Sequence, residues 1–304
     1  MDLCRDKKFI DLTKDIEFFN DNKTKQLKGL MDSDKNVWII EKETGQGSYG
    51  VVYFFKSHNK EYCDVAVKTI RDRNEAADEI LTMTLFNKFR CKNFMRCGGV
   101  EDGNTFIVVM EKMNGDMLSL NYEKLDNPEK LYQQFVNFLI SGYRCAMKRD
   151  MYYTDIKLEN VGFKMCSDGY RFCFLDYGSF SYIDSENFPA SYWINMENAM
   201  EGRFGIDLIV VYGTIMTLLK IKMLMNNTKG AEELSKKVSA LLTNKKYPNT
   251  NLLTKKYFED IKKTYYKYFK KEDEDVEVLM DCLEDLTVEE YSVSRFLDVL
   301  DYHM

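Results

Sequence analysis

The chain has 304 residues, of which 45% are hydrophobic and 30% charged, and its formal net charge is −6. This balance is typical of a globular protein with a sizeable core, and it excludes a disordered chain, which lacks the apolar surface to offset chain entropy. The acidic net charge also argues against nucleic-acid binding as the first interpretation.

The cysteines and histidines limit the possible chemistry. The eight cysteines are scattered without a CxxC pair, and the only histidines are His58 and His303. This composition disfavours a Cys/His zinc site and a Ser/His or Cys/His hydrolase. The N-terminal residues contain no apolar signal core, and the longest uncharged apolar run, Leu208 to Leu219, is shorter than a bilayer span of ~18–20 residues. We therefore expect reduced thiols, no membrane span and a cytoplasmic protein.

Residues 1–36 are charged and partly amphipathic, and we expect one or two helices there, ahead of the main fold. Their apolar side chains are Phe9, Ile10, Leu12, Ile16, Phe18 and Phe19. From residue 37 the pattern changes to short apolar runs, which predict strands, with one helix from Asn74 to Phe89. The predicted strands are Val37–Ile40, Val51–Phe55, Asp64–Ile70 and Phe106–Met110.

After Gly115 the pattern becomes mainly helical. Pro128 follows the capping residues Asp126 and Asn127, which predicts a helix that begins there. Two short strands are expected near Val161–Met165 and Arg171–Leu175, and helices from about Ile206 onward. The predicted fold is therefore α+β, in three parts: a helical extension over residues 1–36, a small antiparallel-sheet part with one helix over 37–112, and a larger mainly helical part over 113–304.

A glycine-rich segment, Gly45-Gln-Gly47-Ser-Tyr-Gly50, joins two predicted strands. Glycines let a backbone approach phosphate closely and offer N–H donors without a Cβ in the way. A dinucleotide-binding turn would need a helix directly afterwards, whereas Val51–Phe55 continues as a strand. A plain glycine-rich hairpin is the alternative interpretation.

One lysine, Lys68, lies on the otherwise apolar strand Val65-Ala66-Val67-Lys68. A buried lysine needs a partner of opposite charge. Glu79 on the following helix is the first candidate, because Met83 and Phe86 lie four and seven residues later and mark an apolar stripe beside it. Glu75 is the second candidate, in a less apolar register.

A short loop further along the chain combines an acceptor, Asp155, a cation, Lys157, and an amide, Asn160. Sixteen residues after Asn160, Asp176 ends a predicted strand and precedes an aromatic residue and a glycine. Magnesium prefers oxygen ligands and is usually held by one or two carboxylates together with phosphate and water. Asp176 and Asn160 fit that requirement.

In this order and at these spacings, the motifs resemble those of eukaryotic-type protein kinases, from Val37 to the C-terminus. The matching motifs are Gly45-x-Gly47-x-x-Gly50-x-Val52 for the nucleotide-covering loop, Val65-Ala66-Val67-Lys68 for the VAIK strand, Asp155-x-Lys157-x-x-Asn160 for the catalytic loop and Asp176-Tyr177-Gly178 for DFG. The Asp-Ile-Lys wording and the DYG variant are similar to the casein-kinase-1 and vaccinia-related-kinase branch. Scarce proline and abundant Lys, Asn, Tyr, Phe and Asp suggest an AT-rich genome, such as that of a large DNA virus or a parasite.

The resemblance implies a bilobal kinase fold, ATP and Mg²⁺ as cofactors and a protein substrate. It implies catalytic roles for Asp155, Lys157, Lys68 and Glu79, and metal binding by Asn160 and Asp176. The segment from Met110 to Met113 resembles the hinge, and Asp116 is a candidate ribose contact. The implied nucleotide-binding residues are Gly45, Gln46, Gly47, Ser48, Gly50, Val52, Ala66, Lys68, Met110, Glu111, Met113 and Asp116.

Some positions depart from the family pattern. Tyr153 and Thr154 replace the His and Arg of the HRD motif, and because Thr154 cannot bind a phosphate as arginine would, we expect no control by activation-loop phosphorylation. Gly162 stands where a bulky residue usually lies beneath the adenine, which suggests a roomier floor or a shifted register. The segment after Gly178 has no APE motif, and Glu197 is the candidate substitute.

Three functions remain open. An active Ser/Thr protein kinase is the first, because Lys157 is the family's Ser/Thr mark. A pseudokinase or scaffold that binds a partner with little catalysis is the alternative, favoured by the HRD and APE departures. A small-molecule kinase is the third, disfavoured by the glycine loop and Lys157.

The basic-aromatic segment Lys255–Lys271 could face RNA or anionic lipid, but a helix with a solvated lysine face and an aromatic core face is the simpler interpretation. The sequence carries no strong nucleic-acid signal and does not indicate the oligomeric state.

Overall fold

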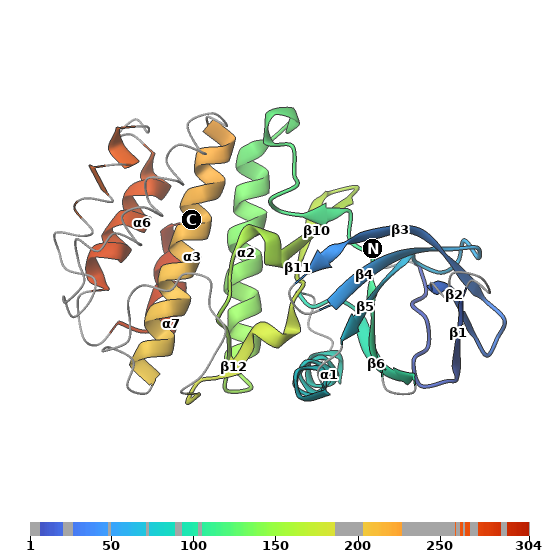
Figure 1. Cartoon of the computed structure of the whole chain (residues 1–304). Coiled ribbons are helices and arrows are strands. Elements are labelled where there is room, and N and C mark those ends of the chain that lie inside the picture. Colours follow the sequence, from blue (N-terminus) through green and yellow to red (C-terminus); the bar gives the residue numbers. More distant parts are fainter. Residues whose placement is uncertain are drawn as a thin grey trace. The chain divides into compact units, whose positions relative to one another are not determined.

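The computed structural model describes residues 7–20, 27–47, 50–70, 73–88, 93–102, 105–185, 203–226, 259, 262–263, 265–267, 273–286 and 291–303. The chain divides into two compact units, whose elements are labelled in Figure 1. The first unit comprises Met1–Gly115 and Gly162–Gly178, and the second comprises Asp116–Val161 and Ser179–Met304.

A curled seven-stranded sheet forms the scaffold of the first unit, with every neighbouring pair antiparallel and the order β1-β2-β3-β4-β5-β7-β6 (Figure 1). Helix α1 (Arg73–Lys88) follows β5 along the chain. An antiparallel sheet with one helix is what the sequence predicted for this part of the fold. The strands are β1 (Ile16–Asn20), β2 (Leu27–Asp32), β3 (Val37–Gly47), β4 (Gly50–Ser57), β5 (Val65–Ile70), β6 (Cys97–Asp102) and β7 (Thr105–Glu111).

One face of this sheet carries a hydrophobic core. Because side chains alternate along a strand, Val65 and Val67 of β5 face this core while Ala66 and Lys68 face the opposite side. Trp38 is fully buried in the core, and its indole N–H donates to the Cys63 carbonyl at 3.0 Å. The other buried members of the core are Ile10, Leu30, Phe55, Ile107 and Val109.

The helical extension predicted for residues 1–36 is wrong. Residues 16–20 and 27–32 form strands β1 and β2, which continue the sheet beyond β3, and Ile10 joins the core described above. Short apolar runs do not distinguish helix from strand by their spacing alone. β2 pairs with the edge of β3, and Ile10 packs on the apolar face of the sheet. Both partners lie in other segments of the chain, so local periodicity could not reveal them.

The boundary predicted at residues 112 and 113 also needs correction. The hairpin of β10 (Val161–Cys166) and β11 (Gly169–Phe174) belongs with the first unit from Gly162 onward, although it follows about fifty residues of the second unit in the chain. Its attachment is visible in hydrogen bonds such as that from the Asn114 N–H to the Phe163 carbonyl at 2.8 Å. The two-residue strand β8 (Gly115–Asp116) lies where the first unit passes into the second.

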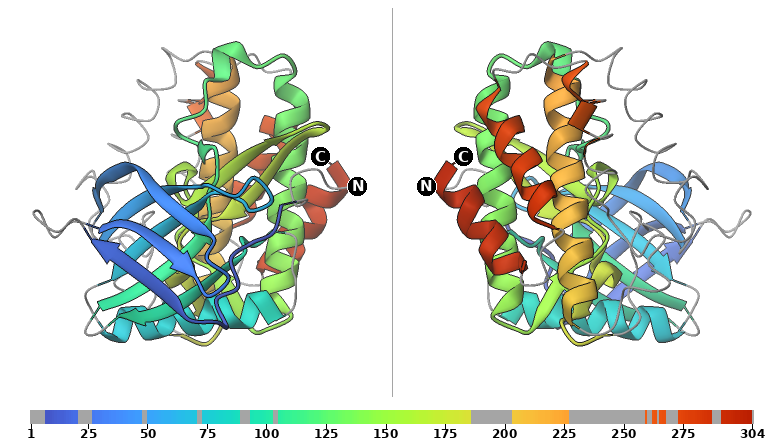
Figure 2. Two further views of the ribbon diagram at one scale, coloured as in Figure 1. Left: turned by 90° about the vertical axis from the view of Figure 1, so that its right-hand side faces the viewer. Right: turned by 90° about the vertical axis from the view of Figure 1, so that its left-hand side faces the viewer.

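Helices form most of the described part of the second unit, as predicted. Helix α2 (Pro128–Met147) begins at the expected proline, and the Asn127 side chain accepts from the Lys130 N–H at 2.9 Å as its N-cap. The other described helices are α3 (Arg203–Asn226), α6 (Glu274–Asp285) and α7 (Val293–His303), with short 3₁₀ turns at Tyr122–Lys124, Leu158–Asn160 and Tyr177–Ser179. Figure 2 shows α2, α3 and α7 side by side. Strands β9 (Met151–Tyr153) and β12 (Phe180–Tyr182) pair antiparallel beside them.

Helix α3 is long and apolar enough to cross a membrane by length and composition, but 83% of that stretch is buried inside the protein. This is the environment of a core helix.

The state of the cysteines differs in part from the expectation. Cys63, Cys97, Cys173 and Cys282 are free and buried. Cys145 and Cys166 each take part in a disulfide bond, so the expectation of reduced thiols is wrong for these two residues. Cys4 and Cys91 lie outside the described residues.

Strand β2 offers a test of its pairing with β1 and β3. A Cβ added at Gly29 would lie 2.2 Å from Cζ of Phe19 and 2.7 Å from the backbone oxygen of Trp38. We expect Gly29→Ala to destabilise the protein by about 1–3 kcal/mol, because the backbone oxygen cannot move without breaking the pairing. Urea unfolding of Gly29→Ala, compared with Lys28→Ala at the exposed neighbouring position, measures the effect. A midpoint equal to that of the wild type would contradict the register of β2.

Candidate active site

The first unit brings Lys68, Glu79 and Asp176 together. Lys68 lies on β5, opposite Val52 of β4 on one side and Val108 of β7 on the other. Its Nζ donates to both carboxylate oxygens of Glu79, at 3.0 and 2.8 Å, and lies 3.5 Å from Oδ1 of Asp176. The predicted ion pair of Lys68 with Glu79 is therefore present.

Burial and charge act against each other on Lys68. Burial lowers the pKa of its amine, but the adjacent carboxylates of Glu79 and Asp176 outweigh burial and raise the pKa above its usual value. The amine therefore stays protonated across the physiological range. Two carboxylates around one cation leave a net negative charge, which suits a metal ion or another cation at Asp176.

Helix α1 presents Glu79 through the register that the sequence indicated. Glu79 is 4% exposed, and Met83 and Phe86 are buried on the same face of α1. Phe86 stacks on Phe94 with ring centroids 3.9 Å apart, which fixes this end of the helix against the segment before β6. The side chain of the second candidate, Glu75, lies outside the described residues.

Asp176 follows β11 and is held in place through its neighbour Tyr177. The Tyr177 ring is fully buried, with centroids 6.4 Å from Phe86 and 6.1 Å from Phe94. Its hydroxyl donates to the Met95 carbonyl at 3.2 Å, a hydrogen bond that a phenylalanine could not make. The turn that bears Asp176 is thereby tied to the chain just before β6.

The glycine-rich segment forms the tip of the β3–β4 hairpin. Gln46 pairs with Val51 and Gly47 with Gly50, with a register shift in β3 between Glu43 and Gln46. The strand that follows Gly50 excludes the helix of a dinucleotide turn, as expected. Ser48 lies outside the described residues, and no side chain from residue 42 to residue 50 is described. The phosphate-binding role of Gly45 and its neighbours stays a prediction.

The predicted nucleotide-binding residues on β4, β5 and β7 occupy paired positions on these adjacent strands. Val52 pairs with Lys68, and Ala66 pairs with Met110. Ala66 and Met110 are buried, at 6% and 7% exposed, and Met113 is 8% exposed.

The space beside Gly162 is filled by neighbouring side chains. A Cβ at Gly162 would lie 2.5 Å from Cδ2 of Leu175 and 2.9 Å from Cγ of Met113. The expectation of extra room at Gly162 is therefore wrong, because these two side chains occupy the space that a larger residue would need.

The side chain of Glu111 lies in a buried ion cluster, and its nucleotide-binding role stays a prediction. Its carboxylate is 0% exposed and pairs with Arg96 at 3.1 Å, Lys164 at 2.6 Å and Arg171 at 2.9 Å. Burial alone would raise the pKa of Glu111, but these three cations hold it at about 2. We call these four residues the Glu111 cluster. The carboxylate is committed to it, so a nucleotide could meet Glu111 only through its backbone.

The second unit brings Asp155, Lys157 and Asn160 together in the loop after β9. Oδ2 of Asp155 accepts from Lys157 Nζ at 2.7 Å and from Asn160 Nδ2 at 2.9 Å. Oδ1 of Asp155 is buried and has no hydrogen-bond partner among the described residues. A buried acceptor without a donor is costly, so this oxygen is suited to a ligand hydroxyl. Because the Asn160 nitrogen donates to Asp155, its oxygen Oδ1 is the end suited to a metal ion.

Hydroxyl groups of α2 and α3 form hydrogen bonds with the backbone of this loop. Tyr143 of α2 donates to the Tyr153 carbonyl at 3.1 Å and receives a hydrogen bond from Thr214 of α3 at 3.2 Å. Thr217 of α3 donates to the Ile156 carbonyl at 3.3 Å. Sequence reasoning missed these residues, and the only available signal was the pair of threonines three residues apart on an apolar helix.

Thr154 also has a structural partner. Both its N–H and its hydroxyl donate to the Ser179 carbonyl, at 2.9 and 3.1 Å, where β9 pairs with β12.

Asp116 accepts from the Ser119 N–H at 2.8 Å and so closes a local turn. Its ribose role stays a prediction.

Two predicted regions are not covered. Glu197 lies outside the described residues, as does most of Lys255–Lys271. Within the latter segment Tyr265 is fully buried, which favours its aromatic residues as core.

The Glu111 cluster can be tested by substitution. Glu111→Gln leaves three cations around an uncharged amide, and we expect a loss of about 3 kcal/mol of unfolding free energy. Glu41→Gln, which removes the exposed carboxylate that pairs with Lys112, should cost less than about 1 kcal/mol. Denaturant unfolding of both variants measures the difference, and equal effects would contradict the importance of the cluster.

The same carboxylate predicts an acid dependence. Its folded pKa of about 2 lies below the ordinary value of 4.5, so its contribution is complete above about pH 4.5 and is lost as the pH falls toward 2. The decline in stability over this range should be shallower in Glu111→Gln than in the wild type.

Comparison with known proteins agrees with this geometry. The family model of the protein kinase domain matches residues 38–197, just over half of the chain. No curated protein matches the chain. The match covers the glycine-rich hairpin, Lys68, Glu79, the Asp155 loop and Asp176. The chain therefore belongs to the protein kinase family.

Proposed function

We propose that the protein is an active, ATP- and Mg²⁺-dependent Ser/Thr protein kinase. The observation that carries this proposal is the ion pair of Lys68 with both oxygens of Glu79, with Asp176 next to the same amine. An apolar residue at position 68 would cost less to bury than a lysine shared by two carboxylates, so a cation retained at this place supports a role in binding phosphate.

The residues of the first unit bind and orient the nucleotide in this proposal. Lys68, held by Glu79, neutralises the α- and β-phosphates, and the backbone of the glycine hairpin covers them. Asp176 is the oxygen ligand that this unit would offer to Mg²⁺, and the resemblance assigns Asn160 of the second unit as a further ligand; when bound, Mg²⁺ would neutralise charge that develops on the transferred phosphoryl group. The carboxylate of Asp176 and the amide oxygen of Asn160 are donors of the kind that Mg²⁺ takes in proteins.

The residues of the second unit act on the attacking hydroxyl. Asp155 accepts the hydroxyl proton, for which Oδ1 is suited because Oδ2 already accepts from Lys157 and Asn160. Lys157 offsets negative charge on the phosphoryl group. Its presence two residues after Asp155 supports serine or threonine as the acceptor, on the strength of the resemblance.

Three finer assignments are proposed on sequence features alone. The Asp-Ile-Lys and Asp-Tyr-Gly motifs support the casein-kinase-1 and vaccinia-related-kinase branch. The residue composition supports a viral or parasite origin. The scattered cysteines, which form no CxxC pair, support a cytoplasmic location.

The proposal predicts that Asp176→Asn and Lys68→Met abolish phosphoryl transfer. Each variant removes a charge that stabilises the transition state by a few kcal/mol, so the rate should fall at least a hundredfold. Labelled ATP·Mg with generic acidic and basic protein substrates measures the rate, and thermal melting checks the fold. Asp126→Asn, at an exposed carboxylate, is the matched control and should keep full activity.

Two results would contradict this proposal in different ways. Full activity of Asp176→Asn would exclude Asp176 from the chemistry. A wild-type protein that gains thermal stability with ATP·Mg but transfers no phosphoryl group would be the pseudokinase named above.

We further propose that activity does not depend on phosphorylation of the segment after Gly178. Where the family has arginine before the catalytic aspartate, that buried cation disfavours the active arrangement until a phosphate pairs with it. Thr154 carries no charge, and it already donates twice to the Ser179 carbonyl at the start of that segment.

Phosphatase treatment tests this second proposal. We expect the dephosphorylated protein, verified by mass spectrometry, to keep its rate within about tenfold of the mock-treated protein, which corresponds to less than ~1.4 kcal/mol of barrier. A larger drop would show that a phosphate does stabilise the active form.

A further inference from the structure

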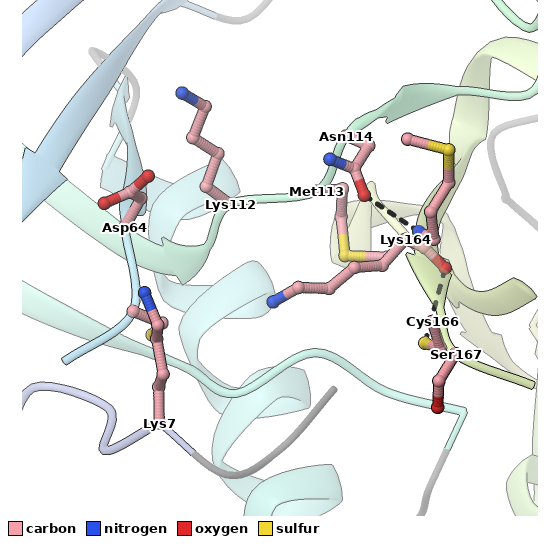
Figure 3. A pocket seen from close by; sticks show the side chains of 10 residues that line it. Lys7, Asp64, Lys112, Met113, Asn114, Lys164, Cys166 and Ser167 are labelled. Atoms are coloured by element: carbon pink, nitrogen blue, oxygen red, sulfur yellow. Dashed lines mark hydrogen bonds between the residues drawn. The ribbon is translucent and has the colours of Figure 1, made fainter. Parts of the chain in front are cut away.

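The first unit contains a concave site that the proposed reaction does not use. It is a cavity of about 380 Å³, within the range of about 300–1,000 Å³ typical of small-molecule sites. Four segments line it: Lys7 near the N-terminus, residues 63–64 before β5, residues 112–114 after β7, and residues 164–167 at the end of β10 and the start of the turn that follows (Figure 3). None of Lys68, Glu79 and Asp176 is among its lining residues.

The lining is cationic. Among the described residues it contains three lysines, Lys7, Lys112 and Lys164, against one carboxylate, Asp64, whose Oδ1 already accepts from the Ser57 N–H at 3.0 Å. Lys112 also pairs with Glu41, so the surplus rests on Lys7 and on Lys164, whose partner Glu111 is shared with two arginines. In Figure 3 the side chain of Lys164 extends into the space that Lys7, Asp64 and Lys112 surround. Because the whole chain carries a net charge of −6, this positive surplus is a local feature and not a general property of the protein.

The Glu111 cluster strengthens the surplus and fixes its geometry. Lys164 is held at 2.6 Å by Glu111, and Arg96 and Arg171 share the same buried carboxylate. One negative charge is thus distributed over three cations, which leaves the wall beside Lys164 positive in surroundings that water screens poorly. The ammonium group of Lys164 is preorganised before any ligand arrives.

Neutral donors complete the lining. The Oδ1 atom of Asn114 accepts from the Met165 N–H at 2.8 Å, so the amide Nδ2 is the end that remains to donate to a ligand (Figure 3). Ser167 adds a hydroxyl at the same turn. Lysines and neutral N–H and O–H donors are the groups that recognise phosphate and carboxylate oxygens.

We propose that this cavity binds a small anionic ligand that carries at least two phosphate or carboxylate groups. Lys164 and Asn114 would contact one group within the cavity, and Lys7 and Lys112 the other at its rim. The inference concerns a site separate from the proposed phosphoryl transfer, and its test requires no catalysis.

Titration calorimetry on the full chain tests the proposal, with Lys68→Met and Glu79→Gln together in every protein, which removes the lysine of the candidate nucleotide site without leaving the Glu79 carboxylate buried and unpaired. The probes are inorganic tripolyphosphate and tetraglutamate, in magnesium-free buffer at physiological salt. The test variant adds Lys7→Gln and Lys112→Gln. The control adds Lys8→Gln and Lys60→Gln, which change the net charge by the same amount at two lysines that do not line the cavity. Lys8 pairs with Glu61 instead.

We expect at least one probe to bind, with Kd at least tenfold weaker in the test variant and within twofold of the starting protein in the control. Asp64→Asn, which keeps the oxygen that Ser57 uses and removes the charge, should tighten binding severalfold. Binding of tripolyphosphate alone would assign phosphate groups, and binding of tetraglutamate would assign carboxylates.

Two outcomes would overturn the proposal: no binding of either probe below 1 mM, or equal weakening in the test and control variants, which would indicate nonspecific surface attraction. If Lys112→Gln proves unfolded by thermal melting, Lys7→Gln alone, at an exposed residue, carries the same comparison against Lys8→Gln.

Discussion

The fold of the first unit depends on keeping charge inside a largely apolar sheet. Lys68 points from β5 away from the Trp38 core, and it is tolerated there because Glu79 meets it from α1 with both carboxylate oxygens. Leaving either charge unpaired would cost several kcal/mol, so the position of α1 against the sheet and the protonation of the amine are fixed together. The stacked rings of Phe86 and Phe94 and the buried Tyr177 extend this constraint to the turn that bears Asp176.

The second unit solves a different problem, which is to hold an irregular loop at a fixed position. The loop from Tyr153 to Asn160 has few regular backbone partners of its own. Helices α2 and α3 provide donors from Tyr143 and Thr217, and these helices are themselves buried along most of their length. A rigid hydroxyl donor on a core helix costs little side-chain entropy, which makes it suited to positioning a loop.

The sequence predicted the parts of the structure in which a local pattern has one physical meaning. The alternation around Lys68, the stripe that places Glu79 beside Met83 and Phe86, and the Asn127 cap before Pro128 each specify a local geometry, and each is found. Residues 1–36 were misread because their apolar spacing suits helix and strand alike, and only the edge of β3 decides between them.

The parts that could not be predicted involve residues far apart in the chain. The Glu111 cluster joins residues from separate segments that follow no regular spacing in the sequence. Neither the cluster nor the cationic cavity therefore has a local sequence signal. The filled space beside Gly162 likewise depends on Met113 and Leu175, which approach it from separate segments. Such contacts follow from the topology and not from any one segment.

The hydroxyl of Tyr177 has a consequence for chemical inhibition. A compound that needs the Asp-Tyr-Gly turn to swing outward must pull this ring from a fully buried site and leave the Met95 carbonyl without its donor. An unsatisfied buried group costs about 1–3 kcal/mol, which corresponds to roughly five- to 150-fold in affinity. Compounds that accept the turn as it stands avoid this penalty, so a screen against this protein should favour them over those that require the swung-out turn.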